Sequence, residues 1–490
     1  MAPHPGRSLL WALLESGGLS VLSLAVLFVI ARFLGPTDLG TAALALGIVQ
    51  MLAIVPETLV HDALVQRPDL DEEHLHTAFW TCLAIGLAFA AGCWLCAPLL
   101  ARAFDSPGLA PLLSVAALSL GFSGAGSVAI AVLRRNFLFK ALALRSLYGR
   151  LFGALAAIAL VFLGFGVWSL IAQYLIQTAV NVLFVWRSTP WRPRLRFSLS
   201  HLRDLISFGV FSMGTRIVWL SSTKLFTILV GYFLGVTAVG YLNVAQRVVD
   251  TLHDMLAGAA YNLALPIFSR QQDDRSALAR TFHTGTEFAG LSVAPIFGGV
   301  AVCAGPIIQL FVGDGWLPAV PVVQALAIAA MFEFPFLFAE AAMTALGRPG
   351  YIFLVSLIAL AFVLVAFLLF PPASVFVAAV LWGSRILITA PVVFSLLNRL
   401  IGRSTLDLVR GTWAPMLGTG IMAAVVWTLQ EKVLRSQAPL VVLLVAIPLG
   451  ALVYGAVLAL IKRDALHRLL LFIAAGIRGR AMPRGKKLEA

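Results

Sequence analysis

Three basic side chains interrupt long apolar stretches in the middle of the chain: Arg216, Lys224 and Arg247. An ionised group inside a membrane span is costly, and by default it faces a cavity or a partner. Arg216 and Lys224 are two helical turns apart along a helix and roughly 80° apart around it. We therefore expect these three cations to line a polar cavity and to attract an anionic group.

Acidic residues follow Arg247 at helical spacing. Arg247, Asp250 and Asp254 stand at positions i, i+3 and i+7, which lie on one face of a helix. We expect Asp250 and Asp254 to act as gating or charge partners, with Asp250 holding Arg247 until an anion binds. A permanent structural salt bridge is the alternative.

Other carboxylates fall inside apolar stretches, and Glu57, Glu333 and Glu340 are the candidates for ion coupling. A carboxylate that is removed from water takes up a proton more readily, so these residues could couple the protein to a proton or sodium gradient. An interhelical hydrogen bond is the alternative for each of them. Arg385, also inside an apolar stretch, is expected to be paired or to lie near an interface.

Side-chain amides form a third polar set. Gln173, Gln177 and Asn181 recur every four residues, and Asn243 and Gln246 precede Arg247. Amides donate and accept hydrogen bonds, which suits sugar hydroxyl groups, so we expect these five residues to contact a glycan. They could equally join one helix to another.

The sequence shows no catalytic constellation and no helix-borne metal motif. We therefore expect a protein that is not an enzyme, with no catalytic residues, no metal site and no cofactor beyond a coupling ion. The phosphate-cradling loop of ATP-driven proteins does not occur in it. His74 and His76 lie in an acidic loop and are expected to be solvated.

The elements that position these side chains follow from the composition. Of 490 residues, 60% are hydrophobic and only 12% are charged, and the mean hydropathy is +0.96. A soluble protein is about half apolar and about a quarter charged, so the solvent for most of this chain is lipid. A spanning helix needs about 20 apolar residues. This rule predicts spans at 8–31, 39–60, 76–98, 109–132, 142–163, 166–186, 206–234, 238–264, 284–311, 319–346, 350–370, 374–397, 411–430 and 438–461.

The predicted fold is an all-α polytopic membrane protein with about fourteen transmembrane helices. We expect two six-helix lobes around a central cavity, at 1–187 and 205–400. A basic cytoplasmic linker at 188–204 joins the lobes, and two further helices and a basic cytoplasmic tail fill 401–490.

The basic residues orient this arrangement. The net charge is +13, and most of the 35 Lys and Arg residues fall in segments on one side of the predicted membrane. Examples are the 134–150 region and the linker. By the positive-inside rule we expect a multi-pass inner-membrane protein with both termini in the cytoplasm.

An internal repeat relates the two lobes. Phe33-Leu34-Gly35 with Thr37 and Gly40 recurs as Phe233-Leu234-Gly235 with Thr237 and Gly240. Each copy is predicted to form the short outside turn between the first two helices of a six-helix set. The repeats are therefore parallel, and transporters built from repeats place their substrate near the repeat interface.

Four segments carry a resemblance to a known family. They are Phe33 to Gly40, Arg134 to Ser146, Gly164 to Gln173, and Leu310 to Pro321. Together they resemble the polysaccharide transport family, the Wzx-type flippases of the multidrug/oligosaccharidyl-lipid/polysaccharide exporter superfamily. The subgroup looks like the exporters of exopolysaccharide repeat units of the xanthan, acetan and colanic-acid type.

The resemblance implies a function and partners. Such proteins move an undecaprenyl-pyrophosphate-linked oligosaccharide from the cytoplasmic to the periplasmic leaflet by alternating access. Arg216, Lys224 and Arg247 would then bind the pyrophosphate. The expected partners are this lipid-linked oligosaccharide, membrane lipids, and a periplasmic polymerase with its export machinery, without nucleic acid. A monomer would suffice, because two lobes already form the cavity.

Two alternatives stay within the same superfamily. One is a lipid II flippase, whose substrate also carries a pyrophosphate. The other is a multidrug/cation antiporter, which would predict a cavity rich in acids, whereas the spans here carry cations.

Overall fold

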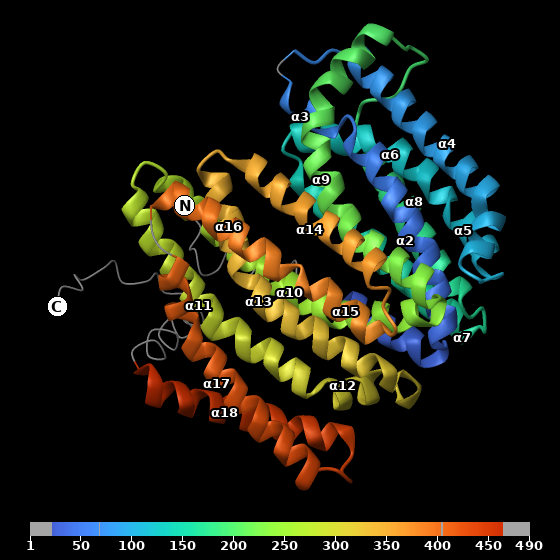
Figure 1. Ribbon diagram of the computed structural model, residues 1–490. Helices are drawn as coiled ribbons and strands as arrows, with labels where there is room; N and C mark the ends of the chain where they lie inside the picture. The colour runs from blue at the N-terminus through green and yellow to red at the C-terminus, as the bar shows by residue number, and fades with distance from the viewer. Residues whose placement is uncertain (1–21, 68, 403–404, 464–490) are drawn as a thin grey trace. The chain divides into compact units, whose positions relative to one another are not determined.

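The computed structural model describes residues 22–67, 69–402 and 405–463, which are helical apart from short connections (Figure 1). Eleven helices in this part of the chain are long and apolar enough to cross a membrane, and Leu22–Phe33 and Ser221–Leu234 are shorter apolar helices. The predicted all-α polytopic fold is confirmed. The first predicted span begins at residue 8, and its part before residue 22 lies outside the described residues.

The helices follow the predicted spans closely. The first part of the chain holds α2 (Pro36–Thr58), α3 (His61–Gln66), α4 (Glu72–Ala103), α5 (Leu109–Ala116), α6 (Leu118–Arg135), α7 (Phe139–Phe162), α8 (Trp168–Ser188) and α9 (Leu199–Leu234). The second part holds α10 (Val236–Arg270), α11 (Arg275–Val302), α12 (Ala304–Phe311), η1 (Asp314–Ala319), α13 (Val320–Ala345), α14 (Pro349–Leu369), α15 (Val375–Ser384), α16 (Ile386–Ile401), α17 (Thr405–Lys432) and α18 (Pro439–Ile461).

Two helix boundaries have simple causes in the sequence. Gly164 and Gly166 between α7 and α8 have φ values of +83° and +54°, which suit glycine because it has no Cβ. Between α14 and α15 stand Pro371 and Pro372, and proline cannot continue a helix because its ring removes the amide donor. Both turns lie where the sequence predicts them.

Helices α9 and α10 are longer than a bilayer requires. They contain 36 and 35 residues and meet at Gly235, whose φ is +81°. At about 1.5 Å per residue each extends about 50 Å, whereas the hydrocarbon core of a bilayer is about 30 Å thick. Both helices therefore reach beyond the hydrocarbon, and α9 begins at Leu199, inside the predicted linker at 188–204, so the last residues of that linker are helical.

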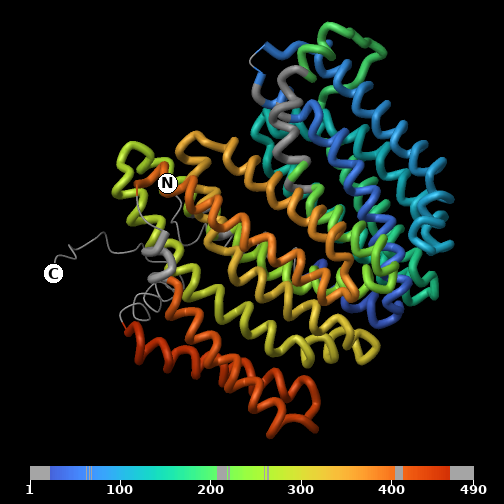
Figure 2. The backbone as a smooth tube through the Cα atoms, in the orientation of Figure 1, coloured from blue at the N-terminus to red at the C-terminus, as the bar shows by residue number. Residues whose placement is uncertain are grey.

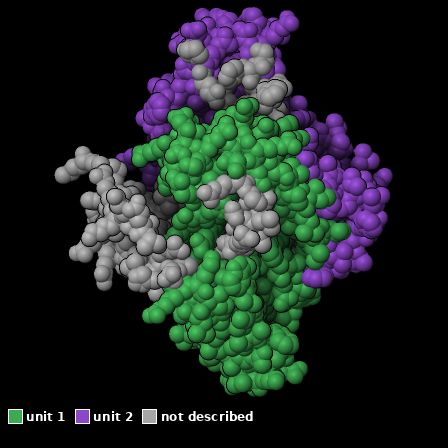
Figure 3. Space-filling model, turned by 60° about the vertical axis from the view of Figure 1, so that its left-hand side comes forward, with its two compact units in different colours: residues 1–24, 245–355, 379–490 green, residues 25–244, 356–378 purple. Residues whose placement is uncertain are grey.

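The chain divides into two compact units (Figure 3). One contains residues 25–244 and 356–378, and the other contains residues 1–24, 245–355 and 379–490. The lobe boundaries predicted from the sequence stay a prediction.

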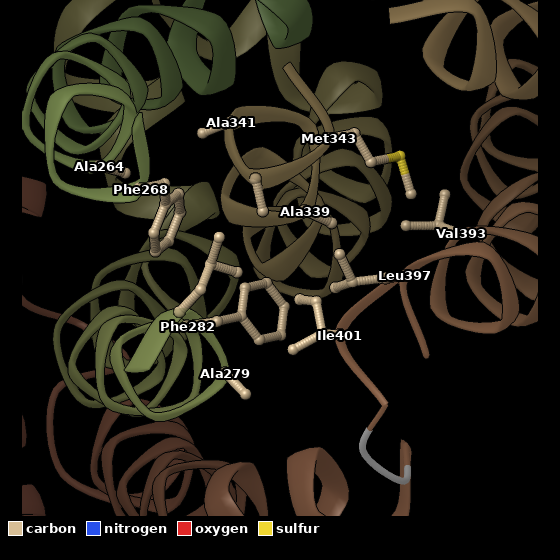
Figure 4. Close-up of a cluster of buried hydrophobic side chains, with 12 residues drawn as sticks. Ala264, Phe268, Ala279, Phe282, Ala339, Ala341, Met343, Val393, Leu397 and Ile401 are labelled. Atoms are coloured by element: carbon tan, nitrogen blue, oxygen red, sulfur yellow. The ribbon is translucent and has the colours of Figure 1, made fainter. Parts of the chain in front are cut away.

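The unit that contains residues 245–355 has an aromatic and aliphatic core. Phe268 of α10, Phe282 of α11, Met343 of α13 and Leu397 of α16 are buried against one another (Figure 4). Removing such side chains from the solvent stabilises a unit by roughly 1.5–3 kcal/mol for each large residue. This cluster fixes one end of these helices.

The two last helices belong to the same unit. α17 packs against α18 and both pack against α11, and their paths run side by side (Figure 2). At the end of α18, the Lys462 Nζ lies 2.8 Å from the Glu287 Oε1 of α11. This ion pair and the buried Tyr454, whose hydroxyl donates to the Leu291 carbonyl at 2.8 Å, attach the additional pair to α11.

Candidate functional site

The predicted anion-binding cations lie on the two longest helices. Lys224 is half-buried on α9, and Arg247 is exposed on α10. Arg216 falls within α9, but its side chain lies outside the described residues. Lys224 and Arg247 each take part in an interaction. Their role in anion binding stays a prediction.

The acidic partners of Arg247 lie where the helical spacing predicts them. Arg247, Asp250 and Asp254 are all exposed on α10. Each of the three takes part in an interaction. Charges of both signs at this spacing can pair or exchange partners along one helix face, and the gating role of the two acids stays a prediction.

An ion pair joins two of the charged residues that the sequence places in spans. The Arg385 Nη2 pairs with the Glu333 carboxylate of α13, and the Arg385 guanidinium also stacks 4.0 Å from the ring centroid of Trp382. The expectation that Arg385 is paired is confirmed. Glu340 is half-buried two turns further along α13, and the negative charge of Glu333 acts on it electrostatically. A cation thus compensates this acidic stretch, as partly buried charges require.

Glu57 belongs to a second polar group inside apolar helices. Its Oε1 accepts a hydrogen bond from the Ser123 Oγ of α6 at 2.9 Å. Its carboxylate also acts electrostatically on Arg145, which lies in the second turn of α7. Arg145 falls inside the predicted 142–163 span, and the structure places it within a helix.

The amide stripe of α8 lies against glycines of α7. A Cβ added at Gly149 would lie 2.2 Å from the Asn181 Oδ1, and one added at Gly153 would lie 3.2 Å from the Gln177 Cβ. Small residues four apart allow two membrane helices to approach closely. Gln173 packs on the same seam, whereas Asn243 and Gln246 are half-buried on α10. Contact of these five residues with a glycan stays a prediction.

The two copies of the repeated turn touch each other. The Thr37 and Thr237 hydroxyl oxygens lie 2.9 Å apart. A Cβ added at Gly40 would lie 1.8 Å from the Val236 carbonyl oxygen, and one added at Gly240 would lie 2.0 Å from the Pro36 carbonyl oxygen. The contact is reciprocal. Gly40 faces Val236, which stands four positions before Gly240, and Gly240 faces Pro36, which stands four positions before Gly40. Only glycine permits this approach of two backbones.

The linker packs on the start of α4. The Trp80 Nε1 donates to the Arg194 carbonyl at 2.8 Å, and the Arg194 amide donates to the His76 Nδ1 at 3.1 Å. Arg194 and Arg196 lie within 4 Å of acids at the beginning of α4, Glu72 and Glu73. This basic segment is therefore held at the helix start by charge and by backbone hydrogen bonds.

Two histidines at the start of α4 lie beneath the linker. His74 and His76 are buried, with 5% and 1% of their surfaces exposed, so the expectation that they are solvated is wrong. The linker covers them, and the sequence of the acidic loop alone could not show this.

Asp71 is the N-cap of α4, and the hydrogen bond from the His74 amide lowers the pKa of the Asp71 carboxyl to about 2.

Comparisons with known proteins agree with this architecture. Residues 29–321 match a family described as polysaccharide biosynthesis protein. The chain is 29% identical over 322 residues to the succinoglycan biosynthesis transport protein ExoT of Rhizobium meliloti (strain 1021), covering 66% of this chain and 65% of that protein. It is 22% identical to the lipopolysaccharide biosynthesis protein WzxC of Escherichia coli (strain K12), covering 66% of both chains. The matches thus span slightly less than two thirds of these relatives.

Solved structures share the fold. The lipid II flippase MurJ in its inward closed conformation has a TM-score of 0.77 at 16% identity, with 94% of this chain and 99% of that chain covered. An inward-facing multidrug resistance MATE family transporter of the MOP superfamily has a TM-score of 0.61 at 16% identity, covering 78% and 94%. The predicted two-lobe membrane fold is confirmed by this likeness.

Proposed function

Because the chain belongs to the polysaccharide biosynthesis protein family that residues 29–321 match, we propose that it is a lipid-linked oligosaccharide flippase. It moves an undecaprenyl-pyrophosphate-linked repeat unit from the cytoplasmic to the periplasmic leaflet of the inner membrane, for exopolysaccharide synthesis. Family membership carries this proposal. The similarity to a transport protein of succinoglycan biosynthesis supports transport rather than an enzymatic activity.

The chemistry of the substrate sets what the protein has to supply. The lipid tail can stay in the bilayer, whereas the pyrophosphate and the sugars have to cross about 30 Å of hydrocarbon. Cations complement the pyrophosphate charge, and the proposal assigns this role to Arg216, Lys224 and Arg247. Asp250 and Asp254 hold Arg247 in the unloaded state because they lie on the same exposed face of α10.

Alternating access requires a contact that can open and close. The reciprocal contact of Gly40 and Gly240, with the paired hydroxyls of Thr37 and Thr237, brings the two repeated turns together. We place this contact on the periplasmic side of the membrane, and it is closed in the state described here. It separates when the substrate leaves.

Coupling to an ion gradient completes the proposed cycle. Glu57, Glu333 and Glu340 are the candidates for carrying a proton or sodium ion. Arg385 compensates Glu333, and Glu340 stands beside that pair, so an ion bound at Glu340 would change the charge balance on α13. A transmembrane proton or sodium gradient imposed on reconstituted vesicles tests this step. Equal rates with and without either gradient would exclude it.

The likeness to MurJ favours a lipid II flippase as the second candidate function. Both substrates contain a pyrophosphate, so the cationic residues do not distinguish them. Deleting the gene in its native host separates the two. The exopolysaccharide flippase predicts repeat units trapped on the cytoplasmic leaflet with intact cell-wall synthesis, whereas a lipid II flippase predicts failure of cell-wall synthesis. A multidrug antiporter predicts neither outcome.

A further inference from the structure

Three side chains with metal-binding chemistry gather where α4 and α9 begin. Asp71 and His74 come from the start of α4, and His201 comes from the first turn of α9. One ligand atom from each of the three lies within 4.8 Å of the others. Imidazole nitrogen and carboxylate oxygen are ligands that zinc accepts, in sets of three or four. The sequence separates His201 from the other two, so no motif spacing reveals the group.

The two carboxylate oxygens of Asp71 have different neighbours: one caps the start of α4, and the other faces His201. Oδ1 accepts from the His74 amide at 2.9 Å and lies 2.6 Å from the His74 Nδ1. Oδ2 lies 3.5 Å from the His201 Nε2. Two ligands of a tetrahedral zinc ion, each about 2.0–2.1 Å from it, are about 3.3 Å apart. The separation of Oδ2 and Nε2 is close to that value.

The second nitrogen of His201 is held by a hydrogen-bond partner. Its Nδ1 lies 2.7 Å from the Ser198 Oγ, which can accept the Nδ1 proton. That tautomer leaves a lone pair on Nε2, directed at the anionic Asp71 oxygen. In that tautomer the Nε2 lone pair and the carboxylate oxygen face each other, an arrangement in which both can bind one cation. A hydrogen bond from the distal nitrogen is also the usual way in which metal-binding histidines are oriented.

His74 supplies a second, independent observation. Only 6% of its side chain is exposed, and its Nε2 is buried without a hydrogen-bond partner in the described structure. Its ring stands edge-on to that of His201 at a centroid distance of 4.3 Å. A buried ring nitrogen without a partner costs free energy. Ligation of the imidazole offers one reason to keep it there.

We propose that Asp71, His74 and His201 bind a divalent transition-metal ion of the zinc class, which joins the start of α9 to the start of α4. Three protein ligands leave one tetrahedral position for water. The side chains of Asp71 and His201 are 58% and 22% exposed, so an ion can enter from solvent. The bound ion holds the linker on α4 and fixes the first turn of the helix that carries Arg216 and Lys224. This site does not depend on the proposed transport activity.

The experiment uses the full chain, purified in detergent with an affinity tag that contains no histidine and stripped with a chelator. Zn²⁺ is titrated by calorimetry, and Co²⁺ is added to record its visible absorption bands, which report ligand number and type. The expected result is one ion per chain with an apparent affinity in the micromolar range or tighter, and a rise in the melting temperature with Zn²⁺.

The variants separate a metal site from a merely structural cluster. Asp71→Asn keeps a side-chain acceptor for the N-cap but loses the anionic ligand, and His201→Gln removes a ligand near the surface. Each is expected to weaken Zn²⁺ binding at least about tenfold and to abolish the thermal shift. His283→Gln on α11 is the matched control and should bind like the wild type. Zn²⁺ binding that Asp71→Asn and His201→Gln leave unchanged, or no binding by the wild type at about 100 μM Zn²⁺, would overturn the proposal.

Discussion

The hydroxyl oxygens of Thr37 and Thr237 lie 2.9 Å apart, although 200 residues separate them in the sequence. Each threonine stands at the same position of a repeated turn. Gly40 and Gly240, three residues further on, place the two backbones against each other in the same reciprocal way. A repeat visible in the sequence is therefore also a point of physical contact between its two copies, and several consequences can be measured.

Enlarging either glycine should destabilise the protein. In Gly40→Ala the new Cβ would lie 1.8 Å from the Val236 carbonyl oxygen, and in Gly240→Ala it would lie 2.0 Å from the Pro36 carbonyl oxygen. The backbones have to separate, and we expect a loss of about 1–3 kcal/mol of stability in each variant, measured by thermal unfolding in detergent. Gly92→Ala is the control, because its Cβ would meet no atom within 4 Å. Equal melting temperatures for Gly40→Ala and Gly92→Ala would contradict this packing.

Locking the same contact should stop transport. In a background without the native Cys82, Cys93, Cys96 and Cys303, the double variant Thr37→Cys/Thr237→Cys places two thiols within reach of each other. Oxidation should abolish oligosaccharide delivery, and a reducing agent should restore it, because the contact has to open in each turn of the proposed cycle. The single variants, oxidised in the same way, provide the control. Full activity of the cross-linked protein would exclude this contact as a gate.

The Glu333–Arg385 ion pair predicts a coupling between two substitutions. Glu333→Gln and Arg385→Gln each leave a partly buried charge without its partner, so each should destabilise the protein by about 2 kcal/mol. The double variant should lose less than the sum of the two single losses, with a coupling energy of roughly 0.5–3 kcal/mol. Arg399→Gln is the control, because Arg399 is exposed on α16, the helix that directly follows Arg385. Strictly additive losses would show that the pair contributes nothing.

Asp274 predicts a pH dependence that originates outside the membrane. As N-cap of α11 its Oδ1 accepts from the Ala277 amide at 2.9 Å and from the Ser276 amide and hydroxyl, and these bonds lower the pKa of its carboxyl below its ordinary value of 3.8. A lowered folded-state pKa stabilises the protein above the unfolded pKa, and this stabilisation is lost as the pH falls through the folded value.

The melting temperature of the wild type should therefore exceed that of Asp274→Asn near neutral pH. The difference should close below about pH 4 as the carboxylate is protonated. Asp273→Asn, one residue earlier and equally exposed, is the control for the loss of an exposed charge in this turn. A constant difference between wild type and Asp274→Asn at all pH values would contradict the assignment.

The sequence predicts the helices well and the side-chain pairing less well. Spans follow from hydropathy because lipid demands about twenty apolar residues in each, and the glycines and prolines at 164–166 and 371–372 end helices by local chemistry. Pairing is a property of distant segments. His74 and His76 looked solvated in their own loop, and the linker over a hundred residues later buries them.

The same limit holds for the candidate site. The spacing of Arg247, Asp250 and Asp254 predicts that they share one face of a helix, because helical periodicity is local. The structure adds that all three are exposed on α10. The charge interaction of Arg145 with Glu57 joins two segments that are far apart in the sequence and could not be seen in either segment alone. The amides of α8 were equally ambiguous, and only the glycines of α7 reveal that they lie on a helix seam.

The most direct test of the central claim uses the purified chain reconstituted in vesicles that contain the undecaprenyl-pyrophosphate-linked repeat unit. The measured quantity is the fraction of the sugar that becomes accessible to a membrane-impermeant glycosidase. The wild type should expose the inner-leaflet half of the substrate. The double variant Lys224→Gln/Arg247→Gln should expose it at least roughly tenfold more slowly, while Arg399→Gln behaves as the wild type. Vesicles with wild-type protein that expose no more sugar than protein-free vesicles, in the presence of proton and sodium gradients of either direction, would contradict the flippase assignment.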